Sequence, residues 1–238
     1  MPIKGLLQPS PNTITFDYFD ISNGTGYDIY FGLKGDDGEY FTTTQSSIRS
    51  EEIASYVDNQ NVTTSFVKYF DIDFDIPFNL PRNVKGKVLV MVPMGARATS
   101  VAQLMSFYTI AKAVHWDGST ETTLATGQSI TTSLTMATAG TAYAARNNFI
   151  VMDVATLKHF KKGETLRITI EGYYKSVANE TYDLMLGHDP ADRDFDNTAP
   201  QEPSIPASMI LGNEISGGGT ITNLGTKLEI HVPFVTDI

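Results

Sequence analysis

The chain contains no cysteine among its 238 residues. Disulfide frameworks, thiolate zinc sites and cysteine nucleophiles are therefore excluded, because each depends on that side chain. The sequence also has no run of ~18 apolar residues of the kind that spans a membrane, and its first residues lack the long apolar core of a signal peptide. We therefore expect a protein that is made in the cytoplasm and is stabilised by packing or by oligomerisation.

Positive charge is scarce as well. The chain has 17 Lys and Arg against 27 Asp and Glu, which gives a formal net charge of −10. At long range this charge repels phosphate backbones and anionic lipid. We therefore expect neither nucleic acid nor a membrane as a partner, and a protein or a cation fits the charge better.

Motifs that carry catalysis are missing too. The four histidines, His115, His159, His188 and His231, are scattered without the spacing of a zinc enzyme. No nucleophile elbow, phosphate-binding loop or dinucleotide fingerprint is present. Glycoside hydrolysis needs two close carboxylates in a cleft, and no local pattern supplies them. The sequence therefore predicts a protein that is not an enzyme.

Strand-forming sequence is abundant. Hydrophobic residues make up 41% of the chain and aromatic residues 11%, which is enough for a dense core. Residues 64–76 alternate most strictly, with Phe70, Ile72, Phe74 and Ile76 on one strand face and Asp71, Asp73 and Asp75 on the other. The three carboxylates lie about 7 Å apart on such a face. That spacing leaves two interpretations: a solvated face, or one calcium ion shared with a neighbouring strand or subunit.

Further strands follow from the same kind of pattern. Strands of this spacing, without regular strand-helix alternation, predict an all-β fold, an antiparallel two-sheet β-sandwich. Residues 98–113 also permit a helix, and Ser50 is a candidate N-cap for a short helix over 50–56. We expect an N-terminal arm over residues 1–20 and a single domain over 21–238. Strands are predicted at 12–19, 27–33, 39–44, 64–76, 86–93, 103–116, 129–136, 149–154, 166–174 and 227–234.

The densest polar stretch covers residues 188–197. Its Asp192, Asp194 and Asp196 match the first three ligand positions of an EF-hand calcium loop, but the sixth position lacks the Gly and the twelfth lacks the Glu. Two interpretations stay open. These aspartates form a calcium site of another type, or they belong to a surface loop in which they cap turns and pair with Arg193.

Several short motifs spread over residues 25–238 resemble a recurring pattern in virion proteins. The resemblance is to jelly-roll structural proteins of tailed bacterial and archaeal viruses, of the kind encoded near capsid genes. The motifs are TGY at 25–27, YFG at 30–32, DFD at 73–75, FNLPRNVKG at 78–86, WDGSTET at 116–122, FKKGETLR at 160–167, GHDP at 187–190 with Arg193, and KLEIHVPF at 227–234.

The resemblance implies a jelly-roll domain and a capsid-associated role. Such a protein is a decoration or cement component, a homotrimer that sits on the shell of the virion and contacts the major capsid protein. It needs no cofactor, with calcium left open. The alternative is a carbohydrate-binding or receptor-binding β-sandwich, a head fibre or lectin-like module, that uses Trp116, or Tyr173 and Tyr174, with the Asp-rich loop.

Overall fold

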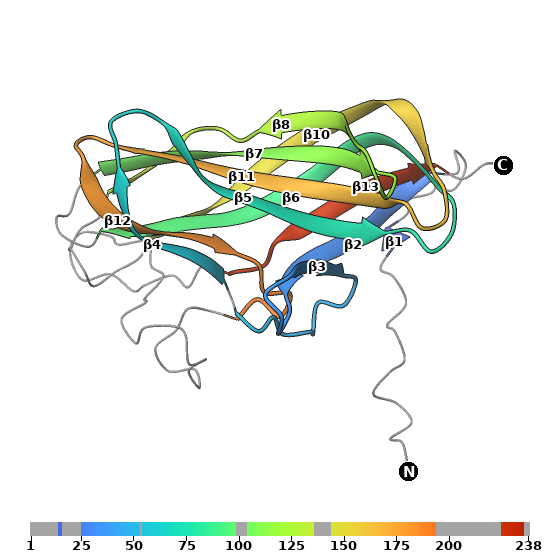
Figure 1. Ribbon diagram of the computed structural model, residues 1–238, viewed down its shortest axis with the longest axis horizontal. Coiled ribbons are helices and arrows are strands. Elements are labelled where there is room, and N and C mark those ends of the chain that lie inside the picture. The colour runs from blue at the N-terminus through green and yellow to red at the C-terminus, as the bar shows by residue number, and fades with distance from the viewer. Residues whose placement is uncertain are drawn as a thin grey trace, which may run out of the picture.

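The computed structural model describes residues 14–15, 25–52, 54–98, 104–135, 144–193 and 225–235. Within these ranges the chain is all-β, as the sequence predicts, and contains no helix (Figure 1). No helix long and apolar enough to cross a membrane is therefore found in this part of the chain. The strands are β1 (Ile14–Thr15), β2 (Thr25–Lys34), β3 (Tyr40–Thr43), β4 (Ala54–Val62), β5 (Val67–Pro77), β6 (Arg82–Ala98), β7 (Leu104–Trp116), β8 (Glu121–Gln128), β9 (Thr132–Thr135), β10 (Ala144–Phe160), β11 (Thr165–Ser176), β12 (Glu180–Gly187) and β13 (Glu229–Val235).

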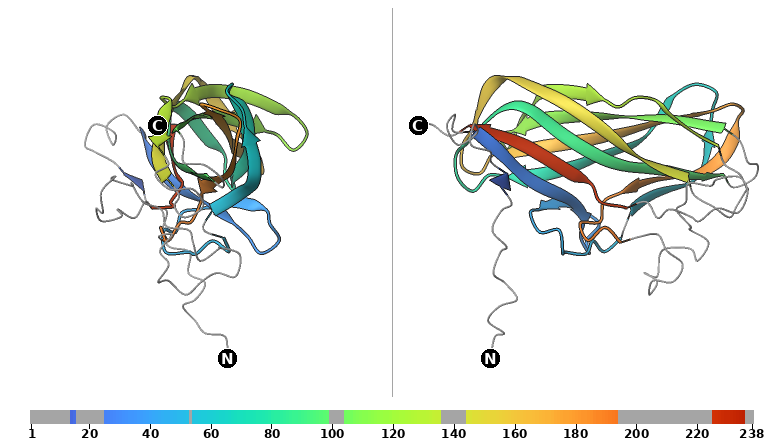
Figure 2. Two further views of the ribbon diagram at one scale, coloured as in Figure 1. Left: turned by 90° about the vertical axis from the view of Figure 1, so that its left-hand side faces the viewer. Right: turned by 180° about the vertical axis from the view of Figure 1, so that it is seen from behind.

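The strands form one curled, mixed sheet. Its main order is β4-β12-β6-β13-β2-β3-β5-β11-β7-β8, and every pairing in it is antiparallel except the parallel bridge between β3 and β5. Figure 2 shows the sheet along its long axis, curled around the core. The structure therefore supports the predicted all-β class. Because the strands form one connected, mixed sheet, the predicted two-sheet antiparallel jelly roll remains an expectation.

Strand β6 is the longest organising element, together with its partner β10. β10 pairs with one edge of β6 from Arg82 to Ala96. The other edge of β6 is shared, because β13 pairs with its first half and β12 with its second half. These pairings bring the last described strand between β2 and β6, far from its neighbours in the sequence.

The sheet almost closes where β8 approaches β10. No side chain fits between the two strands at Gly127, because a Cβ atom there would lie 2.4 Å from the carbonyl oxygen of Val151. Separations below 3.0 Å are essentially never seen for real Cβ atoms. Gly127 therefore permits the close approach of the two strands.

The core lies inside the curl and follows the predicted alternation. In β5 the residues Phe70, Ile72, Phe74 and Ile76 are buried, whereas Asp71 and Asp73 are exposed. The predicted face of the last strand is also confirmed, because Ile230 and Val232 of β13 are buried, as is Leu228 immediately before it. The largest fully buried side chains are Tyr174, Tyr182, Phe74, Phe107 and Phe160.

The short helix predicted over 50–56 is wrong. Ser50, Glu51 and Glu52 have no helical structure, and Ala54 begins β4, which pairs with β12. The backbone N–H of Ser50 donates to the side chain of Asp189 at 2.9 Å, so Ser50 is held by a distant segment and does not begin a helix. For residues 98–113, the strand interpretation is confirmed from Leu104 onward.

Two turns between strands depend on glycine. Gly118 and Gly163 have φ values of 96° and 90°, which favour glycine, in the turns after β7 and β10. Of the predicted N-terminal arm, the structure describes Ile14–Thr15, which pair with β2. The rest of residues 1–20 lies outside the described ranges.

Candidate functional site

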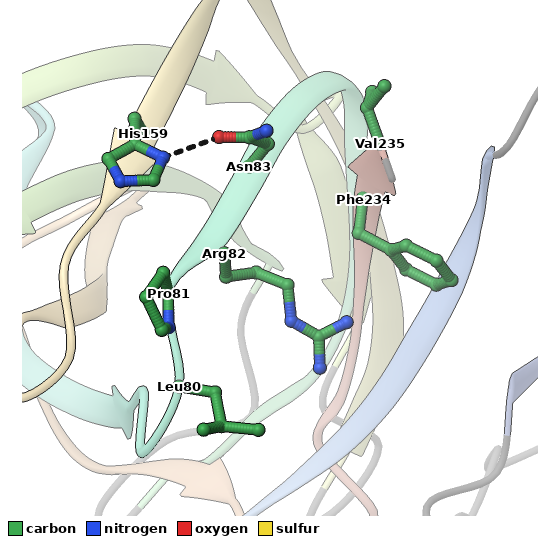
Figure 3. A pocket seen from close by; sticks show the side chains of 7 residues that line it. All are labelled: Leu80, Pro81, Arg82, Asn83, His159, Phe234 and Val235. Carbon is green, nitrogen blue, oxygen red and sulfur yellow. Dashed lines mark hydrogen bonds between the residues drawn. The ribbon is translucent and has the colours of Figure 1, made fainter. Parts of the chain in front are cut away.

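A hollow lies at the end of the curl where β5 ends and β6 begins. It has a volume of about 330 Å³. Figure 3 shows the guanidinium of Arg82 between Leu80 and Phe234, with His159 and Asn83 at the top of the view. His159 Nδ1 lies 2.7 Å from Asn83 Oδ1. The lining residues are Leu80, Pro81, Arg82, Asn83, His159, Phe234 and Val235.

Arg82 is held from two sides. Its Nη2 lies 2.9 Å from Oδ2 of Asp28, and its Cζ lies 5.2 Å from the ring centroid of Phe234. Asp28 is 2% exposed, and its Oδ1 has no hydrogen-bond partner. Burial raises the pKa of Asp28, although Arg82 and the Tyr30 hydroxyl act in the opposite direction. The carboxylate and the guanidinium therefore form an ion pair at the end of the core.

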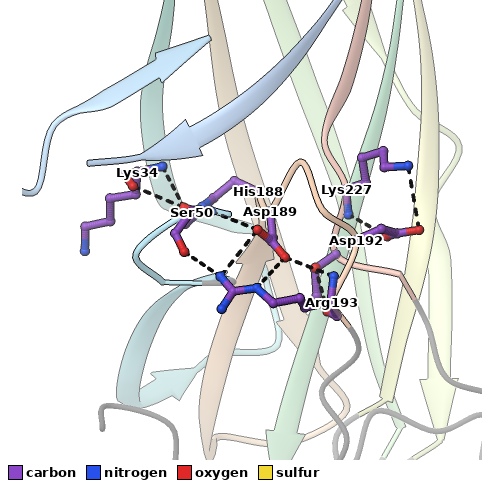
Figure 4. A network of polar contacts seen from close by, with 8 residues as sticks. Lys34, Ser50, His188, Asp189, Asp192, Arg193 and Lys227 are labelled. Carbon is purple, nitrogen blue, oxygen red and sulfur yellow. Dashed lines mark hydrogen bonds and ion pairs between the residues drawn. The ribbon is translucent and has the colours of Figure 1, made fainter. Parts of the chain in front are cut away.

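A second polar cluster connects the end of β12 to the segments before β4 and β13 (Figure 4). The fully buried carboxylate of Asp189 accepts hydrogen bonds from the backbone N–H of Ser50 at 2.9 Å and from Arg193 Nε at 2.8 Å. The backbone N–H of Asp189 donates to Thr226 at 3.0 Å. Asp189 therefore joins three segments that are remote in sequence, and its contacts are those of a structural tie.

His188 lies in the same cluster, beside two serines. Its Nε2 is 2.9 Å from Ser55 Oγ, and its Nδ1 is 3.3 Å from Ser50 Oγ. Burial lowers the pKa of His188 to about 3, so the ring is neutral near pH 7. The hydroxyl of Tyr40 lies 2.5 Å from Ser55 Oγ. A serine beside an imidazole has the elements of a nucleophile and a base, and here the imidazole and both serine side chains are buried.

The candidate calcium residues are described in part. Asp192 is exposed and has a φ of 54°. Its Oδ1 accepts a hydrogen bond from the backbone N–H of Lys227 at 3.1 Å, and its Oδ2 lies 3.9 Å from Lys227 Nζ. Asp194 and Asp196 lie outside the described residues. In the described part of the chain no three His, Asp or Glu side chains are grouped closely enough to hold a metal ion.

The aspartates of β5 lie on an outer face that is covered with ion pairs. Arg167 of β11 binds Asp75 through Nε at 2.7 Å and through Nη2 at 2.9 Å. Thr169 donates to Asp73 at 2.5 Å, and Lys68 lies 2.5 Å from Asp71. Each predicted calcium ligand on this strand thus has a protein partner. We call the outer surface of β5, β11, β7 and β8 the charged face.

Glu171 is the most buried acid of the charged face. Lys112 Nζ lies 2.9 Å and Lys68 Nζ 3.2 Å from its Oε1. Burial alone raises the pKa of Glu171, but the hydrogen bonds from the two lysines outweigh it and hold the pKa below its usual range. This triad could not be predicted from the sequence, because Lys68, Lys112 and Glu171 come from three different strands.

The aromatic residues proposed for sugar stacking have different positions. Tyr174 is fully buried, so its predicted role in binding is wrong; its hydroxyl donates to the backbone of Gly95 at 3.2 Å. Tyr173 is partly exposed and stacks on Tyr108, with ring centroids 4.9 Å apart. Trp116 is partly exposed and lies 5.5 Å from the guanidinium of Arg167.

The opposite outer surface, over β10 and β6, is apolar. Phe149 is 60% exposed and Val151 is 41% exposed. In the register of the sheet, Phe149 lies beside Met91 and Val151 lies beside Leu89. We call this surface, consisting of Phe149, Val151, Met91 and Leu89, the apolar face. The strand predicted at 149–154 lies within β10, and its outward residues Phe149 and Val151 are apolar like its inward residues Ile150 and Met152.

Comparisons with known proteins assign no family. A scan of protein-family models finds no match, and a search of curated proteins finds none. Two crystal structures of a CocE/NonD family hydrolase from Staphylococcus aureus are similar at 12% identity, with TM-scores of 0.42 and 0.45; they cover 89% and 90% of this chain. The structure of infectious bursal disease virus, Gt strain, is similar at 11% identity and a TM-score of 0.21 over 85% of this chain. The chain spans 37% of the hydrolase chain and 46% of the viral chain.

Proposed function

We propose that this chain is a non-enzymatic structural protein of a virion, a decoration, cement or minor capsid component that forms a homotrimer and contacts the major capsid protein. The observation that carries the proposal is the apolar face. Phe149 is exposed next to further apolar residues. Covering such a side chain with a partner stabilises the complex by about 25 cal/mol per Å² of apolar area buried. The motifs shared with jelly-roll virion proteins give the virion context.

The occupant of the apolar face is a second copy of the chain. The molecule carries a net charge of −10, so two copies repel each other over most of their surfaces. At the apolar face each acid has a basic neighbour: Asp153 lies beside Lys87 in the register of the sheet, and Glu229 lies 3.4 Å from His231. The apolar face itself, formed by Phe149, Val151, Met91 and Leu89, carries no charged side chain, so a second copy can cover it without placing like charges in contact.

The finer fold in this proposal is the jelly-roll sandwich. The strands β5, β11, β7 and β8 form one side of the curl, and β10, β6, β13 and β2 form the other. Their inward residues pack together in one core. This arrangement fits two facing sheets that are joined at β3, with each outer face available for a different task.

The test is the solution mass, measured by light scattering, for the wild type and for Phe149→Asp. We expect a trimer for the wild type and a monomer with unchanged circular dichroism for the variant, because a charge in an apolar interface is unpaired. Val177→Asp is the matched control, since Val177 is 58% exposed in the turn between β11 and β12, and it should remain trimeric. A monomeric wild type would contradict self-association.

Two further arms complete the test. Binding to assembled and empty shells of the cognate virus separates a decoration protein from other assemblies, and failure to bind either would remove the virion role. Chelator treatment before light scattering tests the proposed calcium site at Asp192, Asp194 and Asp196. A loss of trimer on chelation would assign calcium a structural role, and an unchanged mass would remove it from the assembly.

The alternative function is carbohydrate or receptor binding. It is favoured by the stacked, partly exposed pair of Tyr173 and Tyr108 on the charged face, because aromatic rings of this kind pack against sugars. Saturable glycan binding by the wild type, lost in Tyr173→Ala, together with no binding to shells, would establish this alternative over the structural role.

A further inference from the structure

The hollow beside Arg82 has the features of a binding site. We propose that it binds a small monocarboxylate that carries an apolar group, with the carboxylate on Arg82 and the apolar group against Leu80, Pro81 and Phe234. This inference does not depend on the assembly proposal, since the hollow lies at the end of the curl and not on the apolar face.

Arg82 supplies the charge recognition. A guanidinium has five N–H donors in a planar fork. The contact with Asp28 uses Nη2, so donors on the Nε and Nη1 side remain for a second carboxylate. The ring of Phe234 and the carboxylate of Asp28 together fix the plane of the fork. A fork held in this way binds a carboxylate with two parallel hydrogen bonds and with little loss of side-chain freedom.

Asp28 sets the charge of the ligand. Because this carboxylate is buried and paired with Arg82, it offsets most of the positive charge that the guanidinium would otherwise present. Each negative charge brought into the hollow is therefore only partly compensated, so a monoanion held by the geometry of the fork is favoured over a dianion such as phosphate. A cationic ligand is disfavoured, because Arg82 lies between the hollow and Asp28. Asp28 is therefore a positioning residue for Arg82.

The remaining walls define the rest of the ligand. Leu80 is 74% exposed at the rim, next to Pro81, and the ring of Phe234 lies on the other side of the guanidinium. Apolar groups of this kind gain from covering a hydrocarbon or aromatic substituent. The volume of about 330 Å³ is at the lower end of the range for ligand pockets, which fits a small acid or one terminal residue of a peptide.

The experiment is a titration of the ¹⁵N-labelled full chain, followed by two-dimensional NMR, with phenylacetate and with its neutral analogue phenylacetamide. We expect saturable shifts for residues around the hollow with phenylacetate, and at least about tenfold weaker binding of the amide, because a charge-assisted pair is lost. A tetrapeptide with a free or an amidated C-terminus forms the second arm, which separates a free acid from a chain terminus as the source of the carboxylate.

Variants locate the site. Arg82→Gln and Leu80→Asp should each weaken phenylacetate binding by at least about tenfold, whereas Ile130→Asp, a control at another highly exposed apolar side chain, should bind like the wild type. Leu80 is largely exposed, so its substitution keeps the test valid if Arg82→Gln does not fold. Equal binding of acid and amide, wild-type binding by Leu80→Asp, or no saturable shift in the wild type would overturn the proposal.

Discussion

The two outer faces of the curled sheet differ in polarity, although the inward residues of both sides are apolar and form one core. On the charged face, acids of β5 and β11 pair with Arg167, Lys112 and Lys68. On the apolar face, Phe149 and Val151 lie uncovered beside residues of β6. Both faces alternate with buried residues of the same core. Under the proposed function, the charged face meets water and the apolar face is covered by a second copy of the chain.

The largest effect on stability should come from the contact between β8 and β10 at Gly127. Gly127→Ala puts a Cβ atom 2.4 Å from the Val151 carbonyl oxygen, so β8 and β10 must separate. We expect a loss of about 2–3 kcal/mol in the free energy of unfolding, measured by urea denaturation. Thr126→Ala, on the exposed side of the same strand, is the control and should cost less than about 1 kcal/mol. Equal stability of the two variants would show that β8 and β10 are not closely packed at Gly127.

A smaller effect is expected from the centre of the charged face. Glu171→Gln removes the charge that holds Lys112 and Lys68, and we expect it to lower the free energy of unfolding by about 1–2 kcal/mol at pH 7. The pKa of Glu171 in the fold lies below its ordinary value of 4.5. The charge therefore stabilises the fold above pH 4.5, and this contribution is lost as the pH falls through the lowered pKa.

The pH dependence distinguishes this contribution from packing. The difference in unfolding free energy between the wild type and Glu171→Gln should shrink as the pH is lowered from 6 to 3, as measured by urea denaturation at each pH. Asp36→Asn, in the exposed turn between β2 and β3, is the control and should show no such trend. A difference that is constant with pH would assign the loss to shape and not to charge.

The smallest effect should come from Arg167→Lys. The ammonium of lysine cannot reproduce the two parallel hydrogen bonds to Asp75. Because the pair is partly exposed, we expect the free energy of unfolding to fall by at most about 1 kcal/mol. The loss should decrease in 1 M salt, because screening weakens exposed pairs. Thermal unfolding at low and high salt measures it, and a loss that is independent of salt would contradict an electrostatic origin.

The sequence predicted most clearly the strands with strong alternation. β5, β11 and β13 were found because large apolar side chains recur at every second position. For β7 a helix was also possible, because its buried positions include Thr109, Ala111 and Ala113. β8 was missed, since Thr, Gly and Gln occupy most of its positions and Leu124 is its one large aliphatic residue. The acids of Ser50–Glu52 resemble a helix start, but the backbone of Ser50 is bound by Asp189, a contact that local sequence cannot reveal.

The candidate sites were predicted less well than the fold. The alternation of β5 placed its aspartates outward, yet their partners Arg167 and Thr169 depend on sheet register. The hollow at Arg82 combines residues from β6, β10 and β13, so its members are close only after folding. The apolar face had a signal in the sequence: residues 149–152 read FIVM, without polar alternation, which is typical of a strand covered on both faces.

The position of β13 has a consequence for how the chain folds during synthesis. This strand is the last one described, yet it lies between β2 and β6, where it hydrogen-bonds to both. Until it emerges from the ribosome, those two strands have unpaired edges and the core lacks Leu228, Ile230 and Val232. Contacts of such long sequence separation form late and slowly. The nascent chain therefore remains open to mispairing of β2 and β6 until β13 has been synthesised.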